Sequence, residues 1–171
     1  MKLEILSYPD PRLKQVCAPV GEITSEIRKL ADDMLETMYE APGVGLAAPQ
    51  VGHFIRMLVM DPARSDEPKR PLVLINPELH LLGDDIVSEG EGCLSVPMQY
   101  RSDVTRKSQV HLVATGIDGK PIDVTWEGYP AIIVQHEADH LDGVLFIDRI
   151  SRLRRSLFEA KLKKWLKHRS A

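Results

Sequence analysis

Apolar residues recur with a helical period in the segment 25–39. The apolar positions lie three or four residues apart and comprise Ile27, Leu30, Met34, Leu35 and Met38. Thr24 or Ser25 precedes this face and offers a side-chain oxygen that can accept from an unpaired amide of the first helical turn. The pattern therefore predicts an amphipathic helix over residues 25–39.

Short apolar runs follow this helix. The segments 54–61 and 71–76 are rich in apolar and β-branched residues, which is typical of strands, and the charged stretch 66–70 between them indicates an exposed turn. The longer segment 108–126 alternates apolar and polar residues on both sides of Asp118-Gly119. That dipeptide strongly favours a tight turn between two strands, so we expect an antiparallel hairpin.

Helical spacing returns from Tyr129 to His140, where Pro130 is tolerated in a first turn and Gly143 suits the end of the helix. A last helix is predicted over residues 151–168. We see no internal repeat, low-complexity tract or linker, so we expect a single domain over residues 1–171. The expected class is α+β, with antiparallel or mixed sheets and with helices near both ends of the chain.

Composition narrows the class of protein. Hydrophobic residues make up 43% of the chain and charged residues 27%, which is typical of soluble globular proteins, and the net charge of -3 argues against a protein that mainly coats nucleic acid. Two cysteines are too few for a disulfide framework and indicate a reducing compartment. No apolar run approaches the roughly 18 residues of a membrane span, and the start has no apolar signal-peptide core. We expect a cytoplasmic protein, with an organelle as the alternative.

The sequence QHEADHLDG, residues 135–143, raises the question of a metal site. On a helix, His136 and His140 lie one turn apart on one face, so both imidazoles can reach a single ion with Glu137 beside it. The alternative is a helix whose histidines simply face solvent. Catalytic sites usually take a third protein ligand and keep one position for water, so a third donor must decide the question.

Cys93 is the strongest candidate for the third donor, because a thiolate at this position would complete a Cys-His-His set. The alternative is that Cys93 is a small buried hydrophobic residue, as we expect for Cys17. The glycines beside Cys93 favour a functional role, since they permit close backbone approach and let the amide of Leu94 point into the site. Other potential donors after His140 have no recognisable spacing; they are Asp142, Asp148, Glu159 and His168.

Three segments together resemble the peptide deformylases, a family that removes the formyl group from new proteins beginning with N-formylmethionine. The motifs are GVGLAAPQ at 43–50, EGCLS at 91–95 and QHEADH at 135–140, intact and in the family's order. The resemblance extends over nearly the whole chain. It implies an α+β fold built around a central metal-binding helix, and a metal-dependent hydrolase that releases formate.

On these motifs, the resemblance implies that Cys93, His136 and His140 bind one divalent metal ion. Family members use Fe²⁺ in the cell, and Ni²⁺, Co²⁺ or Zn²⁺ are alternatives. A water activated by the metal would attack the formyl carbon, with Glu137 as general acid and base.

The resemblance also implies two donors that stabilise negative charge on the formyl oxygen, namely the side-chain amide of Gln50 and the backbone amide of Leu94.

Substrate binding is implied for five residues of the same motifs and of the helix before the histidines. These are Val44, Gly45, Tyr129, Ile132 and Ile133. They would form an apolar pocket for the methionine side chain, with Gly45 where the substrate backbone passes and Tyr129 near the mouth. Taken alone, Ile132 and Ile133 are typical core residues. The rest of an N-formylmethionyl peptide is expected to bind as an added strand.

Two arginines between the second and third motifs are further candidates for a role at the site. The segment 95–106 is one residue longer than the commonest family spacing, which leaves a substrate contact of Arg101 open. Arg106 resembles a family arginine that pairs with the aspartate of the third motif, here Asp139. That pair would brace the helix that carries the ligands.

The last predicted helix is strongly basic, with eight Lys or Arg and one acidic residue between 152 and 169. In some bacterial deformylases the terminal helix docks on the ribosome, and this charge fits contact with RNA phosphates. The alternative is a solvated helix with one face packed on the domain. We expect no membrane partner and no sequence-specific nucleic acid.

Two other functional classes compete with a deformylase. A general zinc metallopeptidase would use the same helix, but the chain shows no third ligand after His140 at a recognisable spacing, whereas Cys93 fits well. A catalytically silent relative that binds peptides or the ribosome would be expected to lack motif residues, and all of them are present.

Overall fold

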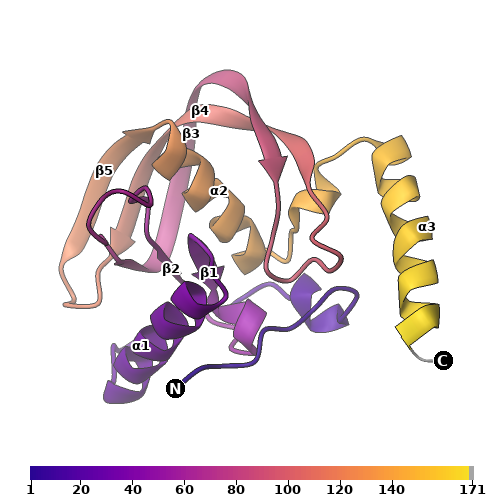
Figure 1. The fold of residues 1–171 in the computed structure, drawn as a ribbon. Helices are drawn as coiled ribbons and strands as arrows, with labels where there is room; N and C mark the ends of the chain where they lie inside the picture. The colour runs from indigo at the N-terminus through magenta and orange to yellow at the C-terminus, as the bar shows by residue number, and fades with distance from the viewer. Residues whose placement is uncertain (170–171) are drawn as a thin grey trace.

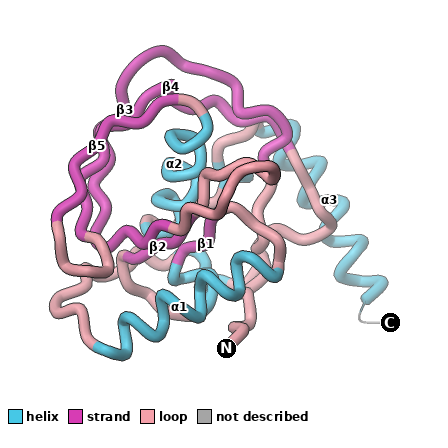
Figure 2. Tube along the Cα trace, turned by 60° about the vertical axis from the view of Figure 1, so that its left-hand side comes forward, coloured by secondary structure: helices cyan, strands magenta, loops and turns pink. Residues whose placement is uncertain are grey.

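The computed structural model describes residues 1–169 and shows a strongly curved sheet wrapped around one helix (Figure 1, Figure 2). The strands lie in the order β1-β2-β3-β4-β5, and every neighbouring pair is antiparallel. The strands are β1 (Gly45–Ala47), β2 (Met57–Met60), β3 (Leu72–Glu91), β4 (Ser102–Thr115) and β5 (Pro121–Glu127). The helices are α1 (Ser25–Glu40), α2 (Tyr129–Leu141) and α3 (Arg152–Arg169). The predicted α+β class is therefore confirmed.

Helix α1 begins where the sequence predicts, with Thr24 as its cap. The Thr24 side-chain oxygen accepts from the Ile27 amide at 3.2 Å, which satisfies one of the unpaired donors of the first turn. The apolar face buries Leu30, Met34 and Met38 against β1 and β2. Helix α1 thus covers the face of these strands that is turned away from α2.

Strand β2 is buried on both faces, because helices pack against it from two sides. Met57 and Val59 belong to the cluster with α1, while Leu58 and Met60 belong to the cluster with α2. A strand between two layers needs apolar residues at consecutive positions. The prediction of a strand within 54–61 is therefore correct, although the observed strand is shorter than predicted at both ends.

The strand predicted over 71–76 is too short. It continues to Glu91 as β3, and its partner β4 begins at Ser102 rather than at residue 108. The β3–β4 pairing shifts register three times, and a residue with positive φ lies at each shift: Asn76, Gly83 and Gly90. Such bulges bend and twist a sheet, so these two strands curl over α2. The same bulges interrupt the regular alternation that reveals a strand in sequence.

Helix α2 is fixed inside this curve along its length. Gln135 accepts from the Lys107 amide of β4 at 3.0 Å and donates to the Lys107 carbonyl at 2.9 Å. At the helix end, the Leu141 carbonyl accepts from the Cys17 amide at 2.8 Å and from the Arg56 side chain at 3.1 Å. The position of α2 therefore does not depend on packing alone.

Helix α3 lies at the edge of the molecule and packs through few residues (Figure 1). Phe158 and Leu162 are buried, whereas Leu153 and Leu157 on another face are exposed. Tyr8 donates to Glu159 at 2.6 Å, which ties the helix to the start of the chain. Within residues 1–169, no helix combines the length and the apolar character needed to cross a membrane.

Gly143, just after α2, offers a test of how tightly the end of this helix is held. Its φ is +74°, and a Cβ added there would lie 2.3 Å from the carbonyl oxygen of Lys14. Gly143→Ala should therefore lower the free energy of unfolding by about 3 kcal/mol or more, since left-handed strain adds to a backbone clash. Gly52→Ala is the matched control, because Gly52 has a φ of +82° with open space around it, and it should cost only about 1 kcal/mol. Equal losses in urea unfolding would show that the contact with Lys14 does not matter.

Candidate metal centre

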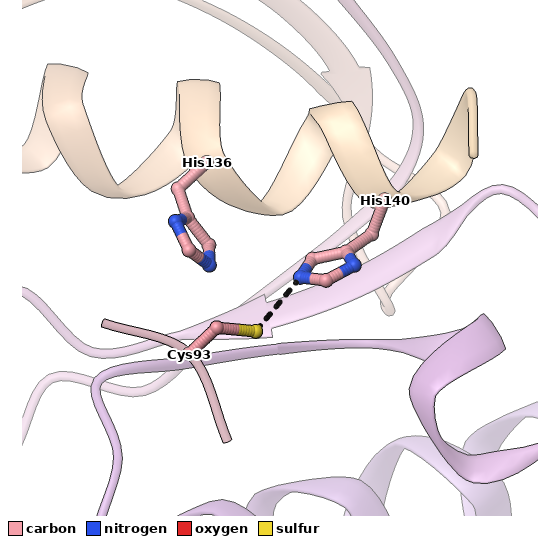
Figure 3. Close-up of side chains that lie close together, drawn as sticks. All are labelled: Cys93, His136 and His140. Atoms are coloured by element: carbon pink, nitrogen blue, oxygen red, sulfur yellow. Dashed lines mark hydrogen bonds between the residues drawn. The ribbon is translucent and has the colours of Figure 1, made fainter. Parts of the chain in front are cut away.

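Three side chains converge inside the curve of the sheet, as Figure 3 shows. The thiol of Cys93 and the imidazoles of His136 and His140 each present one ligand atom within 4.8 Å of the others. The Cys93 sulfur lies 3.3 Å from Nε2 of His140. Helix α2 supplies both imidazoles from successive turns, and Cys93 comes from the loop after β3. Both cysteines are free thiols.

The surroundings of this cluster fit a divalent transition metal. One thiolate and two imidazoles are borderline-soft donors of the kind that Fe²⁺, Co²⁺, Ni²⁺ and Zn²⁺ accept. Two buried polar atoms beside the cluster, Glu137 Oε2 and His140 Nδ1, have no hydrogen-bond partner in the described part of the chain. Buried polar atoms normally have partners, so the unpaired oxygen of Glu137 is consistent with a group that binds at this position. The unpaired Nδ1 of His140 does not bear on that group, because the other ring nitrogen, Nε2, is the one beside Cys93.

Glu91 is a site residue that sequence reasoning missed. Its Oε1 accepts from Nδ1 of His136 at 2.6 Å, which leaves Nε2 of that ring for the cluster. Burial alone would raise the pKa of Glu91, but hydrogen bonds from His136 and Arg106 outweigh this and hold the pKa at about 2. Glu91 is therefore an anion that orients a ligand. Glu91 is the first residue of the EGCLS motif, and this position in the sequence could have indicated a role at the site.

Arg106 links this carboxylate to helix α2. It is buried, pairs with Glu91, and donates from Nη1 to Asp139 at 2.8 Å. The expected pair with Asp139 is thus present, and Arg149 adds a second contact to Asp139 at 2.6 Å that the sequence did not predict. The two arginines join β4, α2 and the segment after α2 around one acidic residue.

Glu137 lies against the cluster with Oε1 3.5 Å from Nε2 of His136. Burial raises the pKa of Glu137 to about 7, although the positive charge of His136 opposes the shift. Gly45 makes this placement possible, because a Cβ at that position would lie only 2.6 Å from Cγ of Glu137. A carboxyl group with a pKa near 7 can accept and return a proton at neutral pH.

Gln50 and Leu94 both lie next to Cys93. Gln50 is buried in the turn after β1, and its Nε2 lies 3.6 Å from the Cys93 sulfur. The amide of Leu94, next to Cys93 in the chain, makes no hydrogen bond to residues 1–169. The arrangement thus offers one side-chain and one backbone donor close to the ligand atoms.

A cavity of about 800 Å³ adjoins the cluster. Its lining includes all five predicted substrate-binding residues, Val44, Gly45, Tyr129, Ile132 and Ile133, together with Leu94 and Glu137. The segment 96–101 forms a further wall, of which the sequence had raised only Arg101, with its substrate contact left open. Within this wall, Arg101 lies along Gly92 and donates to the Gly90 carbonyl at 3.3 Å.

Comparison with known proteins agrees with this geometry. The polypeptide deformylase family model matches residues 2–156. A peptide deformylase of Phenylobacterium zucineum is 49% identical over 168 residues, covering 98% of this chain and 97% of the relative, and one of Alkalilimnicola ehrlichii is 51% identical over 162 residues, covering 95% and 89%. The crystal structure of a peptide deformylase from Legionella pneumophila, 38% identical, superposes with a TM-score of 0.89 over 99% of this chain and 98% of that one. The chain therefore belongs to the polypeptide deformylase family.

Proposed function

We propose that this chain removes the formyl group from N-formylmethionyl peptides at the Cys93–His136–His140 cluster. The observation that carries the proposal is the convergence of three ligand atoms within 4.8 Å of one another with the buried carboxyl group of Glu137 beside them, at a cavity of about 800 Å³ that Cys93, His136 and Glu137 line. A hydrolytic centre needs a metal site, a proton carrier and room for substrate in one place. All three meet here.

Cys93, His136 and His140 would hold one divalent ion, which when bound would supply Lewis acidity toward water and toward the formyl carbonyl. Glu137 would accept a proton from the attacking water and deliver it to the leaving nitrogen. The new C–O bond and the broken C–N bond then give formate and a free amino terminus. We propose Fe²⁺ as the ion in the cell, with Ni²⁺, Co²⁺ and Zn²⁺ as alternatives, because a thiolate with two imidazoles suits each of them.

Negative charge that develops on the formyl oxygen would be stabilised by Nε2 of Gln50 and the backbone amide of Leu94. Gln50 is held before substrate arrives by hydrogen bonds with the Ala47 amide and the Ser95 hydroxyl, and Leu94 directly follows Cys93 in the chain. Such fixed donors act in a site with little water, and the loss of one typically lowers the rate by about a hundredfold to a thousandfold.

The methionine side chain would occupy the part of the cavity lined by Val44, Ile132 and Ile133, with Tyr129 nearby. An apolar pocket of this kind separates similar aliphatic side chains only weakly. Strand β1 lies at the edge of the sheet and, within the described residues 1–169, pairs only with β2, so an extended peptide could bind there as a further strand. Backbone hydrogen bonds of that type accept any sequence after the methionine.

We further propose that α3 contacts the ribosome, which would place the protein in the cytoplasm beside emerging chains. The helix carries eight basic residues and one acidic residue between 152 and 169, and two exposed leucines, Leu153 and Leu157, lie one turn apart. Clustered Lys and Arg bind RNA phosphates without reading sequence.

Substitution of the proton carrier should separate chemistry from metal binding. Glu137→Gln should retain one metal per chain but lower kcat for formate release from a formyl-Met peptide by at least about a hundredfold, because the general acid and base is lost. Cys93→Ala should instead lose metal, as measured by anaerobic metal analysis. Normal turnover by Glu137→Gln would refute the proton-transfer role, and cleavage of an unformylated peptide by the native protein would favour a general metallopeptidase.

The raised pKa of Glu137 also predicts a pH-dependent stability in protein stripped of metal by a chelator. The folded-state pKa of about 7 exceeds the ordinary 4.5, so ionisation is disfavoured in the folded state and stability falls as pH rises from about 4.5 to 7. Glu137→Gln should therefore raise the free energy of unfolding by about 2–3 kcal/mol at pH 8 and by little at pH 4. Urea titrations at both pH values provide the measurement. The exposed Glu89→Gln is the control, and the same gain at pH 4 and pH 8 would contradict the assignment.

Ribosome contact is testable without changing the active site. Lys163→Ala combined with Lys164→Ala should weaken cosedimentation with ribosomes severalfold and reduce its dependence on salt, since two phosphate contacts are removed. Peptide deformylation should remain unchanged. A matched double substitution at Lys2 and Lys120, exposed lysines outside α3, should leave sedimentation intact. If both double variants sediment like the native protein, the docking proposal fails.

A further inference from the structure

Ser95 lies two residues after Cys93 and is completely buried. Its neighbours Leu94 and Val96 line the cavity, whereas the Ser95 hydroxyl lies 3.0 Å from Nε2 of Gln50 and accepts a hydrogen bond from it. The main chain of Ser95 is held on both sides. Its amide donates to the Cys93 sulfur at 3.5 Å, and its carbonyl accepts from the Tyr8 amide at 2.7 Å. The hydroxyl therefore occupies a fixed position.

The side-chain amide of Gln50 has one acceptor oxygen and two donor hydrogens, and each has an identifiable use. Oε1 accepts from the Ala47 amide at 2.9 Å. One hydrogen of Nε2 is directed to the Ser95 hydroxyl at 3.0 Å, and the Cys93 sulfur lies 3.6 Å from the same nitrogen. The hydroxyl thus engages one hydrogen, and Nε2 donates the other to the Cys93 sulfur, a member of the ligand cluster.

We propose that Ser95 is a positioning residue that fixes the direction of the remaining Gln50 hydrogen. The terminal torsion of a glutamine is broad, so a carboxamide held only through its oxygen can rotate its donors away from a given point. With the Ser95 hydroxyl as a second anchor on the amide group, the amide plane is fixed and the other Nε2 hydrogen stays directed at the cluster, where it contacts the Cys93 sulfur. The inference rests on the proposed role of Gln50 as a donor to the formyl oxygen.

A purely structural role would give a different result. If the Ser95 hydroxyl only satisfied a buried amide, its removal would lower stability without a selective effect on the chemical step. A residue that positions a donor for the transition state should lower kcat and leave KM and metal content nearly unchanged. Removal of the Ser95 hydroxyl should also leave kcat unchanged once the Gln50 side chain has been removed.

A double-substitution cycle with the metal-loaded enzyme tests the proposal. Ser95→Ala should lower kcat about tenfold, less than the hundredfold or more expected for Gln50→Ala, because the Ala47 amide still holds the carboxamide oxygen. The double variant should be no slower than Gln50→Ala. Losses that multiply would overturn the proposal. If Gln50→Ala alone had native kcat, the proposed role of Gln50 would fail first, and the two failures are thereby distinguished.

Two controls guard against a folding defect. Ser102, at the start of β4, is another buried serine, and its hydroxyl contacts Arg154 of α3. Ser102→Ala should keep the native kcat. Ser95→Thr retains the hydroxyl oxygen and should recover most of the activity that Ser95→Ala loses. In the zinc-loaded native protein, NMR should show Gln50 carboxamide protons that exchange slowly and lie near the Ser95 Hβ protons. Rapid exchange of these protons would reject the anchor even if no Ser95 variant folds.

Discussion

The buried charge pairs that Arg106 makes with Glu91 and Asp139 are the interaction on which the site depends, because they join the ligand-bearing helix to the strands curled around it. Glu91 extends the network to His136, so the orientation of one candidate metal ligand follows from the same contacts. A buried pair that loses one partner leaves an uncompensated charge, at a typical cost of about 3–5 kcal/mol. Any movement of α2 along the sheet would incur this cost. The network therefore selects one placement of the helix.

Two glutamates within this interior show how partners, rather than burial alone, set protonation. Glu91 has two cationic or donating neighbours and a pKa of about 2, whereas Glu137 has an unpartnered oxygen and a pKa of about 7. Carboxyl groups whose environments separate their pKa values in this way take different tasks. Glu91 stays charged and holds a ligand in place. Burial raises the pKa of Glu137 toward neutral pH, which suits the proposed role of a group that accepts and returns a proton.

Local sequence patterns predicted α1, α2 and the β4–β5 hairpin because each depends on one spacing and its own turn or capping residues. They failed for β3 after Asn76, where bulges displace the alternation, since a bulge is fixed by pairing with a distant strand. The site divides in the same way. The two imidazoles follow from helical spacing and Cys93 from a motif, but Glu91 and Ser95 act through contacts between segments far apart in the chain. No spacing in the sequence encodes those contacts.

The last bulge of β3 explains how the sheet supplies both shape and chemistry. Ser88 and Glu91 are three residues apart, so in a regular strand their side chains would point to opposite faces. The register shift between them, with Gly90 at a φ of +59°, leaves both side chains buried and both on the lining of the cavity. A slip of one residue reverses every side chain that follows it. Without the bulge, the Glu91 side chain would point to the outer face of the sheet, and His136 would lose its hydrogen-bond partner. Cys93, two residues further along, would then also start from the wrong face of the sheet. The irregularity that hides this strand in the sequence is thus the feature that brings the second motif to the helix.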